Sequence, residues 1–311
     1  MAAAEGGRWA EWEGRTRTVT DRISLAQARA LAATLDRDPA SLDSGSVLPH
    51  GWHWIYFNDA VPRSRLAEDG HEARGDFLPP VPLARRMWAG GRIRFHAPLR
   101  IGDDVVRTST IEHVTPKEGR TGALVFVTVS HRIDGREGLA VHEEQDLVYR
   151  GAPADGVAAG AGPRSKVEAP EGSRRVASFV ADPVTLFRFS ALTFNGHRIH
   201  YDHPYATQVE GYPGLVVHGP LVALLLLEAG GGVLAAAGRG SAPGSFRYRA
   251  VGPLFCGEPF DLVTSPDAEE AGTRPEAAGA GPPSVRLWAV HAGRGVAMEA
   301  TVDAGPRATP A

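Results

Sequence analysis

Three histidines lie within seven positions in the second half of the chain, at His197, His200 and His203. Asn195 precedes them, and Asp202 lies between the last two. An imidazole can give or take a proton near neutral pH, and a neighbouring amide or carboxylate can orient the ring or a water molecule. The grouping therefore indicates a site for proton transfer.

A fourth histidine, His218, stands directly before Gly219, Pro220 and the apolar run Leu221–Leu227. Proline is favoured at the first helical position, so we expect a helix to begin here. The amides at its start, including that of Gly219, have no partner within the helix and lie at the positive end of the helix dipole. They can polarise a carbonyl oxygen or hold an enolate.

The elements that must position these groups follow the same order in both halves of the chain, since in each half a helical segment is followed by antiparallel strands. A helix apolar on every side must be wrapped by other elements, and the strand-like segments are suited to wrap it. A curved antiparallel sheet around one buried helix is the hot-dog architecture, so the sequence predicts an α+β double hot dog with the long apolar helix in its C-terminal copy. The predicted helices are 24–35 and 182–192, a turn is expected at Gly90–Gly91, and the predicted strands are 92–96, 105–111, 124–133, 139–149, 245–250, 259–264, 285–291 and 296–302.

An Ala/Gly-rich stretch from residue 151 divides the chain. We expect an N-terminal hot-dog domain over 1–150, a linker over 151–174 and a C-terminal hot-dog domain over 175–305. The first copy has no equally apolar central helix, which predicts that it has lost its own site and serves to bind the acyl group. Its aromatic residues Trp52, Trp54, Tyr56 and Phe57 fit either core packing or one wall of an acyl-binding groove.

Composition excludes several classes of function. The 311 residues include 33 basic and 36 acidic ones, a net charge of -3, which gives no field for binding nucleic acid. The one cysteine, Cys256, rules out an intrachain disulfide and a cysteine-based zinc site. The first residues lack a basic start followed by an apolar run, and Leu221–Leu227 is shorter than a membrane span, so we expect a cytoplasmic protein without a membrane anchor.

The segment FSALTFNGHRIHYD, which contains the histidine group, resembles the hydratase signature of the MaoC-like family. It is most similar to the branch that includes mesaconyl-C4-CoA and itaconyl-CoA hydratases and 3-hydroxyacyl-thioester dehydratases, and the similarity extends over most of 48–302. The resemblance implies that His200 is the catalytic histidine and that Gly219 supplies an oxyanion amide. It also places Asn195 where the family has a catalytic aspartate and His197 where it has an asparagine.

The function implied is the reversible addition of water to an α,β-unsaturated acyl thioester, carried by CoA or by an acyl carrier protein and needing no cofactor or metal. His200 is expected to transfer the proton, Asn195 to place the water, and His197 or Asp202 to serve as the second acid or base. A carboxylated acyl group would need an arginine. The residues assigned to substrate binding are Arg198, Asp202, Val217 and His218, with Arg247 and Arg249 for the CoA phosphates and Arg85 and Arg86 as weaker candidates.

Three alternatives stay open. The spacing His197-x-x-His200-x-x-His203 suits a metal site on a helix, although Gly196 and Pro204 disfavour a continuous helix there. Asn195 in place of aspartate also fits a non-catalytic subunit that binds acyl thioesters. A thioesterase would need a carboxylate on or near the central helix, and Glu228 is more simply a glutamate at the edge of the core. The chain can act as a single unit or form a homodimer.

Overall fold

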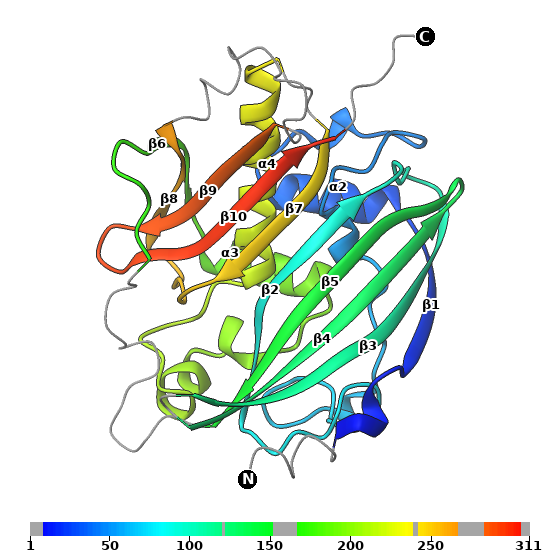
Figure 1. The fold of residues 1–311 in the computed structure, drawn as a ribbon, viewed down its shortest axis with the longest axis vertical. Coiled ribbons are helices and arrows are strands. Elements are labelled where there is room, and N and C mark those ends of the chain that lie inside the picture. The colour runs from blue at the N-terminus through cyan, green and yellow to red at the C-terminus, as the bar shows by residue number, and fades with distance from the viewer. Residues whose placement is uncertain (1–8, 120–121, 152–166, 239–241, 267–282, 306–311) are drawn as a thin grey trace.

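The computed structural model describes residues 9–119, 122–151, 167–238, 242–266 and 283–305. Its strands form one continuous antiparallel sheet of ten strands in the order β1-β3-β4-β5-β2-β7-β10-β9-β8-β6. Figure 1 shows the strands of the first half and those of the second half side by side, meeting where β2 lies next to β7. This is the arrangement expected of two hot-dog units in one chain.

One predicted strand, β8, has the predicted bounds, and the other predicted strands are longer than the sequence patterns indicated. Two strands, β1 and β6, were not predicted. Those of the first half are β1 (Thr16–Arg22), β2 (Arg85–Phe95), β3 (Asp104–Gly119), β4 (Gly122–Gly135) and β5 (Gly138–Arg150). Those of the second half are β6 (Arg174–Val180), β7 (Pro243–Ala250), β8 (Pro259–Thr264), β9 (Ser284–His291) and β10 (Gly295–Ala304). The predicted linker lies mostly outside the described residues, so the division of the chain there stays a prediction.

The predicted turn at Gly90 and Gly91 is wrong, because both residues lie inside β2 at an irregularity in its pairing with β5. A Cβ atom on Gly90 would lie 2.5 Å from the carbonyl oxygen of Tyr248, and one on Gly91 would lie 2.6 Å from the Tyr248 hydroxyl. The two glycines therefore let β7 approach β2 closely. They mark the join between the halves of the sheet.

Two helices begin where the sequence predicted. The side chain of Ser24 caps α2 (Leu25–Thr34), and that of Asp182 caps α3 (Pro183–Leu192), which has proline in its first turn. In both cases the side-chain oxygen accepts a backbone N–H that the helix itself leaves free. Short helical turns follow at η3 (Trp52–Ile55), η5 (Arg198–His200) and the π-helical η6 (Tyr205–Val209), with η1 (Ala10–Trp12), η2 (Pro39–Ser41) and η4 (Arg63–Arg65) elsewhere.

The central helix α4 (Gly219–Ala236) extends beyond the apolar run Leu221–Leu227 and includes the glycines at 230–232. A Cβ atom on Gly230 would lie 2.4 Å from Val302 Cγ2, so this glycine allows the helix to pack closely against β10. The helix is long and apolar enough to cross a membrane by length and composition, but 61% of it is buried inside the protein. It is the core helix around which the C-terminal sheet curves (Figure 1).

Candidate active site

A cavity of about 1310 Å³ extends between the two halves of the chain. The C-terminal half contributes the loop after α3, η5 and the first residues of α4. The N-terminal half contributes the segment around η3, the loop before β2 and the inner face of β3, β4 and β5. The cavity lining includes Trp54, Tyr56, Phe57, His71, Arg86, Phe187, Phe194, Asn195, His197, His200, Tyr201, Val217 and Gly219.

His200 lies at the wall of this cavity with its side chain almost fully buried. Its Nδ1–H donates to the carbonyl oxygen of Val216 at 2.7 Å, which fixes the tautomer and leaves the lone pair on Nε2. Burial lowers the pKa of His200 to about 4, so the ring is neutral at physiological pH. A neutral imidazole with a fixed free lone pair is suited to act as a general base.

His218 supports His200 from behind. The two rings are stacked with centroids 3.7 Å apart, and Nε2 of His218 hydrogen-bonds the hydroxyl of Ser190 at 2.8 Å. His218 is 1% exposed and does not line the cavity, and its Nδ1 is buried without a hydrogen-bond partner. Burial, and then the proximity of His200 and His197, lowers the pKa of His218. Its predicted role in substrate binding stays a prediction, and the geometry places it as the second layer under the His200 ring.

Gly219 stands at the start of α4 and lines the cavity. The amide of Val222 donates to the carbonyl oxygen of His218, closing the first turn, so the amides of Gly219 and Leu221 precede the first helical hydrogen bond. A Cβ atom on Gly219 would meet nothing within 4 Å. A ligand carbonyl can therefore approach this backbone. Val217 lies beside it, and its amide donates to the carbonyl of Leu254.

Asn195 lies on the loop that follows α3. Its Oδ1 accepts the backbone N–H of His197 at 3.0 Å, a bond that shapes the loop. The residue before it, Phe194, has a φ of 49°, a left-handed conformation that normally favours glycine. This turn brings Asn195 and His197 to the cavity, while the Phe194 side chain stays 64% exposed at its edge.

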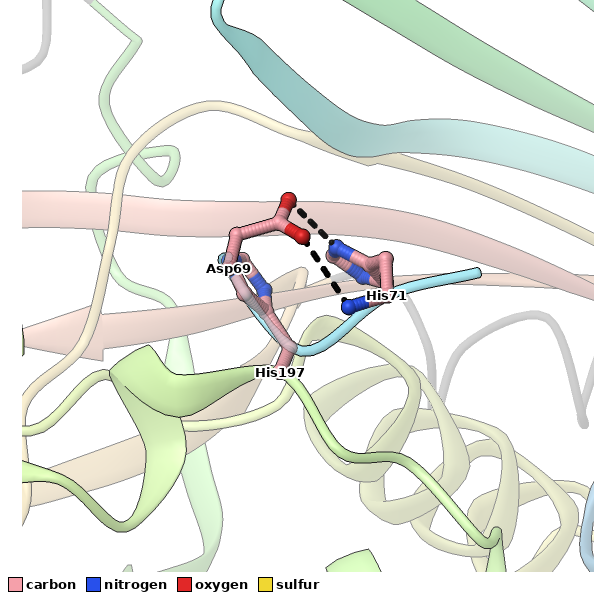
Figure 2. A group of neighbouring side chains, drawn as sticks. All are labelled: Asp69, His71 and His197. Carbon is pink, nitrogen blue, oxygen red and sulfur yellow. Dashed lines mark hydrogen bonds and ion pairs between the residues drawn. The ribbon is translucent and has the colours of Figure 1, made fainter. Parts of the chain in front are cut away.

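His197 contacts His71, a residue of the N-terminal half (Figure 2). The two ring centroids are 4.0 Å apart, and His200 lies 5.4 Å from His197 on the other side. Burial, and then His71 and His200, lowers the pKa of His197 to about 2. Together with His218, these side chains form a contiguous row of four imidazoles drawn from both halves of the chain.

Asp69 bonds His71 twice (Figure 2). Its Oδ2 accepts from the His71 ring Nδ1–H at 2.9 Å, and its Oδ1 accepts from the His71 backbone N–H at 3.0 Å. Burial alone would raise the pKa of Asp69, but the hydrogen bonds from His71 hold it well below its usual range. Burial, and then the charge of Arg86, lowers the pKa of His71. The donor atoms of Asp69, His71 and His197 lie within 4.8 Å of one another.

Arg198 and Asp202 bind each other and do not line the cavity. The guanidinium of Arg198 donates to Asp202 Oδ2 at 2.8 and 2.9 Å and also reaches the carbonyl of Glu68. Asp202 Oδ1 accepts from the backbone N–H of Tyr205, the first residue of η6. Their predicted contact with substrate stays a prediction. In the structure, their hydrogen bonds hold this loop in place. His203 is exposed.

Arg247 and Arg249 alternate on β7 as predicted, and both face away from the cavity. Arg247 pairs with Asp303, and Arg249 pairs with Glu299 at 2.7 Å. The buried neighbours Phe246 and Tyr248 point to the other face of the sheet. The two arginines are therefore placed on the outer face of the sheet, with carboxylates opposite them.

The N-terminal sheet carries a buried polar group on its inner face. Glu143 is 3% exposed, accepts from His53 Nε2–H at 2.9 Å and accepts from Trp54 Nε1–H at 3.0 Å. Burial would raise the pKa of Glu143, but the bond from His53 lowers it, so the carboxylate is ionised. His131 lies nearby, bonded to Ser109 at 2.8 Å, and burial lowers its pKa. All of these residues line the cavity.

The aromatic residues noted in the N-terminal half lie partly at the cavity and partly in the core. Trp54, Tyr56 and Phe57 line the cavity, whereas Trp52 is core and donates its Nε1–H to Glu228. Glu228 also pairs with Arg37, so this glutamate joins α4 to the first half at the edge of the core, as expected. Sequence reasoning missed Asp69 and His71. A usable signal was present, because Asp69-Gly70-His71 repeats the form of Asn195-Gly196-His197.

Comparison with known proteins identifies a family and several relatives of this chain. Residues 51–256 match the family of hydroxyacyl-thioester dehydratase type 2. The chain is 49% identical to mesaconyl-C4-CoA hydratase of Chloroflexus aurantiacus over 264 residues, which cover 84% of this chain and 90% of the relative. It is 30% identical to the mitochondrial hydroxyacyl-thioester dehydratase type 2 of Schizosaccharomyces pombe, over 79% of this chain and 88% of the relative.

Solved structures agree on the fold. A protein of Mycobacterium tuberculosis described as a double hot dog superposes with a TM-score of 0.58 at 14% identity, covering 94% of this chain and 96% of its own. This likeness confirms the predicted double hot-dog fold. The family match covers more than half of the chain and two relatives reach 30% identity or more, so the chain is a member of the hydroxyacyl-thioester dehydratase type 2 family.

Proposed function

We propose that the protein catalyses the reversible addition of water to an α,β-unsaturated acyl-CoA thioester. The observation that carries the proposal is the geometry of His200. Its Nδ1–H is held by the carbonyl of Val216, its Nε2 is free at a cavity wall, and the amide of Gly219 lies on the same wall. Its near relatives are named as a hydratase and a dehydratase of acyl thioesters.

The arrangement supports a balanced addition. The water oxygen forms a bond to Cβ while His200 Nε2 takes one of the water protons. The π electrons move to the thioester oxygen, where the amides at the start of α4 stabilise the enolate. Cα then takes the proton from the His200 imidazolium, so the histidine ends neutral and the product has gained one H and one OH.

We propose a carboxylated acyl group of the mesaconyl-C4 kind, because the 49% identical relative is named for that substrate. In such a thioester the free carboxylate is attached to Cβ, the carbon to which water adds. The cation that binds it must therefore lie close to the histidines. Arg198, the arginine predicted for this role, is already paired with Asp202.

Arg86 on β2 fits the requirement. It lines the cavity, and its charge acts on both His71 and His197. Its neighbour Arg85 is paired with Glu210 at 2.8 Å, whereas Arg86 forms no ion pair with a carboxylate among the described residues. A guanidinium with no carboxylate partner beside the reaction centre is suited to bind a carboxylate of the substrate.

Turnover of a small panel tests the proposal. Mesaconyl-C4-CoA, itaconyl-CoA, crotonyl-CoA and a longer enoyl-CoA are followed by the loss of enoyl-thioester absorbance. We expect hydration of mesaconyl-C4-CoA to be fastest. Arg86→Gln should lower kcat/KM about 10²-fold for mesaconyl-C4-CoA and far less for crotonyl-CoA, which has no carboxylate.

The same panel separates the remaining alternatives. Tight binding of CoA esters with no turnover of any of them would favour a non-catalytic acyl-thioester-binding subunit. Turnover that is lost on incubation with EDTA and regained with a divalent metal would favour a metal-dependent enzyme. We expect turnover to be unchanged by EDTA, because His200 and the amides of α4 supply the proton transfer and the oxyanion contact.

The CoA moiety is proposed to leave the cavity past Phe187, Phe194 and Tyr201. All three line the cavity and are more than half exposed, which gives an apolar mouth for the pantetheine and the adenine. A thioester of an acyl carrier protein would have to pass the same rim. Competition by free CoA against mesaconyl-C4-CoA would distinguish a CoA site from one built for a carrier protein.

We further propose a cytoplasmic enzyme whose site is complete within one chain. Both hot-dog halves that line the cavity belong to the same polypeptide. A homodimer would therefore not be needed to assemble the site. Light scattering combined with activity measured over a range of protein concentrations would test this, since a site that needs a second copy loses specific activity on dilution.

A further inference from the structure

We propose that His71, oriented by Asp69, is a second catalytic imidazole that binds the reacting water opposite His200. The inference rests on the proposed hydration and adds a residue from the N-terminal half to its chemistry. Asp69 does not touch the water in this scheme and acts through His71, so it is a positioning residue.

Neither of the two C-terminal side chains expected to assist His200 offers a free carboxylate. Asn195 cannot serve as a base, and its Oδ1 is already used by the backbone N–H of His197. Both carboxylate oxygens of Asp202 are already in use, because one accepts from the Arg198 guanidinium and the other from the backbone N–H of Tyr205. The carboxylate bonded within the histidine row is that of Asp69, which comes from the other half of the chain.

The two glycine-containing loops are built alike. In Asp69-Gly70-His71 and in Asn195-Gly196-His197, the first side chain accepts the backbone N–H of the histidine at 3.0 Å. The difference is that Asp69 has a second carboxylate oxygen for the His71 ring, and this bond sets the ring orientation.

Glycine is required where these loops meet. Gly70 has a φ of +88°, and a Cβ atom on it would lie 1.9 Å from the carbonyl oxygen of Gly196. The amide of Arg198 also donates to the carbonyl of Asp69 at 2.9 Å. This close backbone packing holds the His71 ring against His197. The position of His71 is therefore set by contacts between the two halves and not by its own loop alone.

His71 and His200 line the same cavity. Because Nδ1–H of His71 donates to Asp69, the lone pair is on Nε2, and this atom has no hydrogen-bond partner among the described residues. A water molecule has two O–H groups. In the proposed arrangement one is bonded to His200 Nε2 and the other to His71 Nε2, which directs an oxygen lone pair at Cβ.

The proton count is unchanged by this addition. His200 takes the first proton and returns it to Cα, while the second proton stays on the oxygen and becomes the hydroxyl proton of the product. His71 must be neutral to accept that O–H. The charged and titratable groups around it are Asp69, Arg74, Arg86 and His197, of which Asp69 favours the cationic ring and the two arginines disfavour it.

The experiment compares His71→Ala and Asp69→Asn with the wild type, and uses His203→Ala as the matched control. His203 is an exposed histidine of the same stretch that does not line the cavity. kcat and KM are measured for mesaconyl-C4-CoA hydration, and the Kd of butyryl-CoA, which cannot be hydrated, reports on whether the site is intact.

We expect His71→Ala to lower kcat about 10²- to 10³-fold, the effect of losing one preorganised hydrogen-bonding group, with the Kd of butyryl-CoA changed less than about threefold. Asp69→Asn should lower kcat about tenfold or more, because its amide cannot hold the same tautomer of His71. Asp69→Asn should also move the acidic limb of the kcat/KM profile to lower pH, since the carboxylate that favours protonated His71 is gone. His203→Ala should behave as wild type.

Three results would overturn the inference. The first is a His71→Ala enzyme with wild-type kcat. The second is a loss of kcat matched by an equal loss of butyryl-CoA binding, which would make His71 structural. The third is a stoichiometric metal ion in the purified protein that His71→Ala removes, which would make the group a metal site. A wild-type protein that turns over none of the panel would instead refute the proposed hydration.

Discussion

The two halves of the sheet enclose different interiors. The C-terminal half curves around α4, and its inner face is packed with apolar side chains such as Phe246, Leu287 and Val302. The N-terminal half curves around part of a cavity, and its inner face carries Ser109, His131, Glu143 and Gln145. One half is filled by a helix, and the other leaves room for a ligand.

The difference separates two tasks of the site. The packed half fixes the atoms that need exact placement, because α4 presents the Gly219 amide and holds His218 under His200. The open half supplies space and polar groups that line the cavity, including His71 and Arg86. The half that lacks a long central helix therefore forms much of the cavity wall.

The largest effect is expected at the His200 ring of the packed half. His200→Ala should lower kcat/KM by about 10²- to 10⁴-fold, because the group that takes and returns the proton is removed. Steady-state kinetics on mesaconyl-C4-CoA measure this. A His200→Ala enzyme with wild-type activity would show that the packed half does not supply the group that transfers the proton.

The polar interior of the open half is tested by Glu143→Gln. The change removes a buried carboxylate that accepts hydrogen bonds from His53 and Trp54, and it should lower the free energy of unfolding by about 3 kcal/mol. The neighbouring change Glu144→Gln is the control, since Glu144 faces outward and pairs with Arg92 near the surface, where such pairs contribute less than about 1 kcal/mol. Urea unfolding measures both, and equal effects would contradict a polar interior.

The buried histidines predict how stability depends on pH. The folded-state pKa of His200 is about 4, below the usual 6.5, so the unfolded chain binds a proton between these values and the folded chain does not. This contribution is fully present above pH 6.5, and about 3 kcal/mol of it is lost as the pH falls to 4. His200→Gln should flatten the slope in urea unfolding across that window. An unchanged slope would mean that His200 already carries a proton in the fold.

Two glycines of α4 test how tightly the packed half is filled. Gly230→Ala should destabilise the protein by about 1–3 kcal/mol, because the new methyl group collides with Val302. Gly232→Ala should stabilise it by about 0.5–1 kcal/mol, because nothing lies within 4 Å and alanine favours the helix. Thermal unfolding should show a lower midpoint temperature for Gly230→Ala and a higher one for Gly232→Ala. Shifts of the same sign in both variants would show that α4 packs loosely against β10.

The smallest effect is expected on the outer face of the sheet. Replacing both Arg247 and Arg249 by alanine should leave the KM for the CoA ester within about twofold, since each already pairs with a carboxylate at the surface. A large rise in KM would show that the CoA phosphates reach this face and would restore the phosphate-binding role predicted from the sequence.

Much of the framework could be predicted because it depends on local rules. Ser24 and Asp182 cap their helices, Pro220 lies in the first turn of α4, and alternation identifies most strands. The glycines at 90–91 misled the prediction, because glycine also permits close packing in the interior of a strand, and Gly230 does the same inside a helix. Which use a glycine serves depends on a neighbour distant in the sequence, such as Tyr248 or Val302.

The sequence by itself determined the double hot-dog fold, the buried helix and the prominence of His200, since these follow from periodicity, caps and a contiguous motif. Only the tertiary structure decided which side chains share the cavity. In the structure His71 contacts His197, which is 126 positions away in the chain. Arg198 pairs with Asp202. Arg247 and Arg249 lie on the outer face of the sheet and pair with carboxylates there. The physical reason is that a functional site depends on contacts between distant segments, whose meeting is fixed by packing of the whole sheet and not by any local pattern.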